Sequence, residues 1–194
     1  MPETPVSLLD RLRAASDPGL WHQLVSIYSP LLRHWLRQLH VPAQDADDLC
    51  QEIFVVVMRE LPHFHRGQQR GAFRCWLRTI AVHRVLAFRR SEASRPMAVS
   101  EEHLMEMVGQ LQDPGTELSR LWDEQHDRHV LRGLLDVVRG DFEDRTWQAF
   151  ERLVFRGEKA AAVAADLAMS VAAVHGAKSR VLKRLREEAQ GLID

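Results

Sequence analysis

The stretch RGAFRCWLRTIAVHRVLAFRR, residues 70–90, combines an apolar stripe with a row of arginines. The apolar side chains that recur at helical spacing are Phe73, Trp76, Leu77 and Ile80. The arginines spaced four apart on a second face are Arg70, Arg74 and Arg78. Guanidinium groups bind phosphates and flat rings stack on unpaired bases, so this helix suits the capture of a nucleic-acid strand. A core helix with a solvated basic side explains the same pattern about as well.

Two side chains of this stretch need a separate interpretation. Arg84 falls near the apolar stripe, so we expect it to pair with a carboxylate or to reach past the core to the surface. The ring of Trp76 suits either the core or a stacked base, and we favour the core.

The residues before this stretch read as further helices, with no strand alternation. A short helix is predicted for residues 7–15 and a longer one for residues 21–39, which Pro30 should bend or break near Tyr28 and Ser29. Residues 43–61 form a third helix, capped by Asp45 or a neighbour. Its face opposite the buried stripe carries Asp47, Asp48, Gln51 and Glu52. Residues 1–92 are therefore predicted to form a compact helical domain.

The second half begins with a segment that is rich in acidic residues, proline and glycine. Residues 93–124 are interpreted as an acidic linker with room for one short helix, and residues 125–194 as a second small helical domain. Long helices are expected over 118–138 and 141–155. The whole chain is thus predicted to be all-α, with two small helical domains joined by the linker.

The last thirty or so residues show the most specific local pattern. A helix of small residues, a tight connection at 167–169 and a helix capped by Ser170 have the spacing of a helix-turn-helix. The residues predicted to face away from its core are Ala172, Gly176, Ser179, Arg180 and Lys183. Small side chains and long cations on that face suit insertion into a DNA major groove. An ordinary helical hairpin with a charged end is the alternative.

Composition limits the function classes. The net charge of −1 hides basic blocks at 59–90 and 178–186 around an acidic block at 92–127, so two cationic faces remain possible. No signal peptide or membrane-spanning run is visible, which predicts a cytoplasmic protein without membrane insertion. The two cysteines are expected to be reduced, and the ten histidines are scattered, so we expect no metal or other cofactor. The chain lacks a nucleophile elbow, a phosphate loop and paired metal-ligand motifs, which argues against an enzyme.

Taken together, the motif DADDLCQEIF at 45–54, the arginine-aromatic stretch and the final helix-turn-helix resemble a bacterial RNA polymerase sigma factor. The resemblance is to the extracytoplasmic function (ECF) group of the sigma-70 family. The first two motifs are similar to parts of the family's region 2, and the last one to its region 4.

The resemblance implies a role for each motif. Core RNA polymerase would bind Asp47, Asp48, Gln51 and Glu52. The candidates for contact with the opened minus-ten promoter element are Phe64, Arg70, Arg74, Trp76, Arg78, His83 and Arg84. The candidates for contact with the minus-thirty-five element are Ser170, Ala172, His175, Gly176, Ser179, Arg180, Lys183 and Arg184. The acidic linker would thread the polymerase's RNA exit path, and an anti-sigma factor or a regulatory kinase would control the protein.

The sequence also departs from the family pattern. Val82 and His83 replace an arginine-asparagine pair, Ala87 replaces an aspartate, and Ala168 stands where a turn glycine is usual. The promoter sequence therefore cannot be transferred from the family. A stand-alone helix-turn-helix regulator, with an N-terminal dimerisation or sensing domain, is the competing interpretation, although such a protein has no need of the acidic face together with the arginine-aromatic helix.

Overall fold

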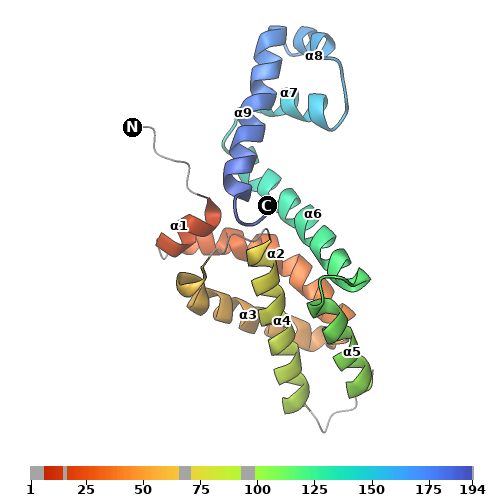
Figure 1. Cartoon of the computed structure of the whole chain (residues 1–194). Helices are drawn as coiled ribbons and strands as arrows, with labels where there is room; N and C mark the ends of the chain where they lie inside the picture. Colours follow the sequence, from red (N-terminus) through yellow and green to blue (C-terminus); the bar gives the residue numbers. More distant parts are fainter. Residues whose placement is uncertain (1–6, 15–16, 66–70, 93–98, 194) are drawn as a thin grey trace.

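In the computed structural model, residues 7–14, 17–65, 71–92 and 99–193 are described, and these residues form helices without a β-strand (Figure 1). The predicted all-α fold is therefore confirmed for this part of the chain. Of the candidate site residues, Arg70 lies outside the described residues. The elements are α1 (Leu8–Ala14), α2 (Pro18–Gln38), α3 (Ala43–Glu60), the 3-10 turn η1 (Leu61–His63), α4 (Ala72–Ser91), α5 (Glu101–Gln112), α6 (Glu117–Arg139), α7 (Asp144–Val154), α8 (Ala160–Asp166) and α9 (Val171–Ala189).

Side-chain caps set several helix starts. Asp17, Ser100, Thr116 and Ser170 each accept a hydrogen bond from a backbone N–H in the first turn that follows. These bonds satisfy amides that have no partner within the helix. The predicted cap of α9 by Ser170 is thus confirmed.

Helix α2 continues through Pro30, so, of the predicted bend or break, the break does not occur. A proline in a helix interior costs about 3 kcal/mol, because one hydrogen bond is lost and the ring crowds the preceding turn. Here Tyr28, Leu31, Leu32 and Trp35, on both sides of the proline, are at most 2% exposed. Each large apolar side chain gains roughly 1.5–3 kcal/mol on burial, which together outweighs the cost of the proline.

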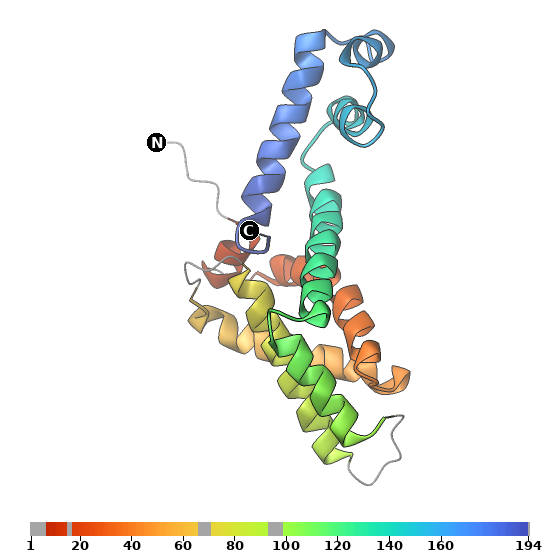
Figure 2. The same cartoon turned by 45° about the vertical axis from the view of Figure 1, so that its right-hand side comes forward.

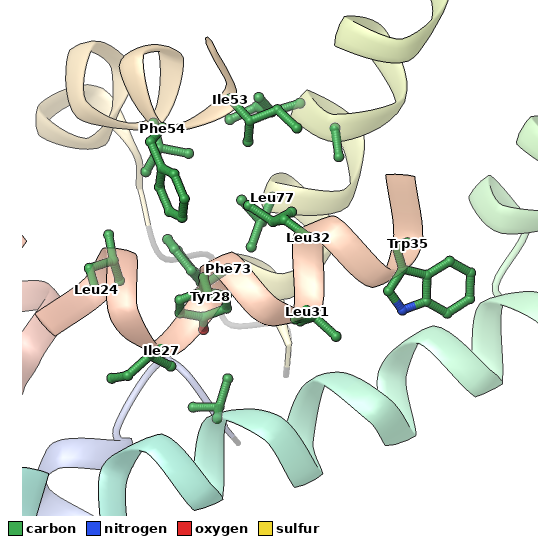
Figure 3. Close-up of a cluster of buried hydrophobic side chains, with 14 of the residues drawn as sticks. Leu24, Ile27, Tyr28, Leu31, Leu32, Trp35, Ile53, Phe54, Phe73 and Leu77 are labelled. Atoms are coloured by element: carbon green, nitrogen blue, oxygen red, sulfur yellow. The ribbon is translucent and has the colours of Figure 1, made fainter. Parts of the chain in front are cut away.

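The core of the first half is built around α2 (Figure 3). Its side chains Leu24, Ile27, Tyr28, Leu31 and Leu32 lie among Ile53 and Phe54 of α3 and Phe73 and Leu77 of α4. This arrangement follows from the helical stripes in the sequence, because each helix buries only the face on which its apolar residues recur.

Helices α5 and α6 pack on this core, although the sequence pattern of residues 93–124 predicts a linker. Helix α5 buries Leu104, Val108 and Leu111, and α6 buries Trp122 against Trp35, with ring centroids 5.1 Å apart. Helix α6 then extends from the first helices to α7 (Figure 2). One cluster of buried residues therefore runs from Leu8 to Leu192, across the segment interpreted as a linker.

Helices α7, α8 and α9 enclose a second, smaller cluster. It contains Ala149, Val163, Ala164, Val174 and Ala177. Between α8 and α9 the chain bends by 103°. Ala168 in this connection, where a turn glycine is usual in the family, has φ 49°, a left-handed conformation that costs a residue with a Cβ about 1–2 kcal/mol.

No single helix among the described residues is long and apolar enough to cross a membrane. The pair α8 and α9 reaches such a length and composition only when both are taken together across their bend.

We predict opposite effects from two glycine-to-alanine substitutions in helices. A Cβ at Gly133 of α6 would lie 2.7 Å from Cγ1 of the buried Ile27 of α2, whereas a Cβ at Gly109 of α5 would meet nothing within 4 Å. Gly109→Ala should raise the free energy of unfolding by about 0.5–1 kcal/mol, because alanine is the better helix former. Gly133→Ala should lower it by about 1–3 kcal/mol, because the two helices are forced apart. Urea unfolding followed by circular dichroism measures both, and stabilisation by Gly133→Ala would contradict the close packing of α2 and α6.

Candidate polymerase-binding and nucleic-acid-binding surfaces

The acidic face of α3 lies on the surface. Asp47, Asp48, Gln51 and Glu52 are all exposed, because they lie on the helix side opposite the buried Leu49, Ile53 and Val57. Asp47 forms an ion pair with Arg33 of α2. Within the described part of the chain, the other three side chains form no ion pair.

Two exposed apolar side chains extend this face. Val55 is 63% exposed and lies about one turn beyond Gln51 and Glu52 on α3, and Met58, about two turns beyond them, is 49% exposed. Sequence reasoning missed them, although their positions outside the apolar stripe of α3 carried the signal. Exposed apolar side chains beside carboxylates and an amide are a composition found at protein-binding surfaces.

The arginine row of α4 faces α6. Arg74 forms ion pairs with Asp123 (3.3 Å) and Asp127 (3.2 Å), and Arg78 is only 5% exposed. The guanidinium of Arg78 donates a 2.6 Å hydrogen bond to Ser119 Oγ and lies 3.7 Å from a carboxylate oxygen of Asp123. Arg74 and Arg78 do share one face, as their spacing predicted, but α6 covers it. In this conformation neither guanidinium is available to a phosphate.

A buried polar pair lies next to these arginines. His126 of α6 is fully buried and its Nδ1 lies 3.0 Å from a carboxylate oxygen of Asp127. Because a carboxylate only accepts, Nδ1 carries the proton, and Nε2 accepts from the hydroxyl of Tyr28 at 3.1 Å. Burial lowers the pKa of His126 from its ordinary value of 6.5, despite the neighbouring carboxylate of Asp127. Burial likewise raises the pKa of Tyr28.

The aromatic candidates form a small cluster at the start of α4. Phe64 and Trp76 are half-buried, with ring centroids 4.7 Å apart, and both lie against the buried Phe73. Trp76 is therefore packed on the core but keeps an accessible part. Farther along α4, His83 is exposed and Arg84 is half-buried.

Most of the candidates on α9 lie on its surface. The exposed ones are Ser170, Ala172, His175, Ser179, Arg180 and Lys183, and Gly176 is half-buried. Arg184 differs, because it forms ion pairs with Asp141 (2.8 Å) and Glu188 (2.5 Å). Glu188 is 1% exposed and also binds Arg11 of α1 at 2.7 Å. Arg184 therefore belongs to an ion-pair network near the C-terminal end of α9.

The described residues contain no group of three or more His, Cys, Asp or Glu side chains arranged to hold a metal ion. Both cysteines are free: Cys50 is buried and Cys75 is exposed.

The state of His126 predicts how stability depends on pH. Its pKa is lower in the folded chain than the ordinary 6.5, so below about pH 6.5 the unfolded chain binds a proton that the folded chain does not. Stability should be fully present above that pH and should fall below it, by at most about 1.4 kcal/mol per pH unit for this one group. Urea unfolding between pH 5 and 8 tests this, and His126→Gln should flatten the profile. His129, whose pKa is lowered chiefly by burial, acts in the same direction, so His129→Gln measures its separate contribution to the profile.

A direct titration of the histidine ring protons by NMR separates the two contributions. A pKa at or above 6.5 for His126 in the folded protein would contradict its burial as the neutral ring.

Comparison with known proteins finds a similarity for the segment that carries the acidic face of α3. Residues 24–95, from α2 to just beyond α4, match the family model described as Sigma-70 region 2. This match covers less than half of the 194 residues and does not include α5 to α9. No curated protein matches the chain. Residues 24–95 are therefore similar to sigma-70 region 2, a similarity that supports a sigma-factor role in transcription initiation.

Proposed function

We propose that the chain is a sigma factor of the ECF type, which binds core RNA polymerase and directs promoter recognition and opening. The observation that carries this proposal is the exposed row of Asp48, Gln51 and Glu52 on α3, within the segment that matches sigma-70 region 2. As a sigma factor the protein is not an enzyme, because the polymerase carries out the chemistry of RNA synthesis.

The acidic face of α3 suits a basic protein partner. Carboxylates and an amide present acceptors to arginines and lysines and steer the approach of a cationic surface. Val55 and Met58 would supply apolar contact area beside them. Surfaces of this kind gain affinity from the apolar contacts and orientation from the charges.

The minus-ten surface is proposed at the start and the middle of α4. Phe64 and Trp76 would offer ring edges to an unstacked base, and His83 and Arg84 would contact the strand farther along. Arg74 and Arg78 would contribute indirectly. Their ion pairs and hydrogen bond to α6 would fix the position of α4. Arg70 remains a candidate by its place in the sequence.

The minus-thirty-five surface is proposed on α9. The 103° bend between α8 and α9 falls in the range of about 90–120° found in helix-turn-helix motifs. Small exposed residues near the start of α9 would let the backbone approach the base edges, and Arg180 and Lys183 would contact phosphates. Arg184 is better assigned to the ion-pair network with Asp141 and Glu188.

The domain roles of the remaining chain follow from the same proposal. Residues 93–124 would act as the acidic linker in the RNA exit path, and an anti-sigma factor or a kinase in the cytoplasm would control the protein. Because α5 and α6 bury Leu104, Val108 and Trp122 in the core, entry of this segment into the polymerase would require its release from the first helices.

Run-off transcription with core polymerase across a pool of genomic promoter fragments tests the proposal. The wild type should start transcription at a defined motif, and Asp48→Ala with Glu52→Ala should reduce the product by about tenfold or more, because two acceptors for the polymerase are lost. Glu124→Ala with Asp136→Ala, which removes two exposed carboxylates of α6, should have little effect. DNA binding without any polymerase-dependent start would instead favour a stand-alone regulator.

A second substitution pair tests α9. On the promoter found above, Arg180→Ala with Lys183→Ala should weaken binding of the polymerase complex and reduce its dependence on salt by about one counterion for each lost phosphate contact. Arg13→Ala with Arg120→Ala removes two exposed arginines elsewhere and should leave the salt dependence unchanged. Equal losses in both pairs would assign the effect to net charge and not to α9.

A further inference from the structure

A groove between α2 and α6 gathers positive charge on the side of α6 away from α4. It has a volume of about 300 Å³ and is lined by His34 of α2 and by Arg128, His129 and Arg132 of α6. Gln125 adds an amide, and Pro30 and Leu31 form an apolar wall. No carboxylate lines the groove, although the described chain has abundant acidic residues on the neighbouring turns of α6.

The two arginines of the groove differ from the arginines that join neighbouring elements of this protein. Arg11, Arg33, Arg74, Arg152 and Arg184 each bind a carboxylate. Neither Arg128 nor Arg132 has an ion-pair partner within the described residues.

Such partners are within reach along α6 itself. Glu124 lies four residues before Arg128, and Asp136 lies four residues after Arg132, the spacing at which helical ion pairs form. Both arginines line the groove, and neither forms an ion pair with Glu124 or Asp136. Their charge is therefore concentrated at one place on the surface.

The walls of the groove are rigid. Trp35 packs on Trp122, Tyr28 is hydrogen-bonded to His126, and Ile27 contacts Gly133, so α2 and α6 are fixed together along its length. A ligand would not have to order the site before it binds, which saves the entropy cost of closing two helices around it.

From these observations we propose that the groove binds a small phosphorylated molecule, through a terminal phosphate or a diphosphate group. Two guanidinium groups on consecutive turns match the paired oxygens of phosphate, and the imidazoles and Gln125 supply further donors. A terminal phosphate carries a charge of about −1.5 to −2, whereas each phosphate of a DNA backbone carries a single charge along an extended track. A compact groove with an apolar wall therefore fits a small ligand better than a strand.

The neighbouring charges are consistent with this assignment. Burial is the largest cause that lowers the pKa of His129, and Arg132, His126 and His34 lower it further. A bound phosphate would neutralise part of this positive field, so the pKa of His129 should rise when the ligand binds.

The test uses the full chain alone, with inorganic pyrophosphate as the probe, and follows the ring protons of His34 and His129 by NMR. Pyrophosphate should shift both rings in a saturable way and raise the thermal midpoint. Arg128→Gln with Arg132→Gln should weaken binding by about tenfold or more, because two charge-assisted contacts are lost. Arg13→Gln with Arg120→Gln makes the same change in net charge away from the groove and should leave binding unchanged.

Three results would overturn the proposal. The first is that millimolar pyrophosphate causes no saturable shifts, and the second is that both double variants weaken binding equally. The third is that the protein binds a single-stranded oligonucleotide through Arg128 and Arg132 but does not bind pyrophosphate through them. The last result would assign the groove to a DNA backbone. Because no polymerase is present, each result is independent of the outcome of the run-off experiment.

Discussion

The docking of α6 on α2 is the contact on which the rest of the structure depends. Trp122 packs on Trp35, and His126 accepts a hydrogen bond from the hydroxyl of Tyr28. Gly133 has no side chain, which lets Ile27 approach α6 closely. Twenty-five residues separate α4 from α6, and these contacts bury α6 in the same core as the segment that matches sigma-70 region 2. Because α6 also reaches α7 and α9, the position of the second helical unit depends on the same packing.

This packing changes the role of the arginines on α4. Arg78 is buried against Ser119, and Arg74 is neutralised by Asp123 and Asp127, so their charges stabilise a helix contact. Removing one partner of such a pair would leave a poorly solvated charge, which is more costly than losing an exposed arginine. The proposed DNA contacts therefore shift to the half-buried rings of Phe64 and Trp76 and to His83 and Arg84.

Charged side chains on opposite sides of α6 have different roles. Asp123 and Asp127 face α4, whereas Arg128 and Arg132 line the groove beside α2. One side of α6 is thus engaged in ion pairs with α4, whereas the two arginines on the other side have no ion-pair partner among the described residues. Helix α6 therefore contacts both α4, the helix proposed to face DNA, and the groove proposed to bind phosphate.

The sequence by itself determined the helices, their buried stripes, the exposed acidic face of α3 and the cap of α9 by Ser170, because each of these depends on side-chain spacing or on contacts within one turn. It also gave the resemblance that the region 2 match supports for residues 24–95. Only the tertiary structure decided that α2 continues through Pro30, that α6 covers Arg74 and Arg78, and that Arg184 belongs to the network of Glu188. Apart from the Arg184–Glu188 pair within α9, those outcomes depend on summed burial or on partners more than forty residues away, such as Asp141 for Arg184. Helical periodicity specifies which face of a helix is buried but not which helix will cover it.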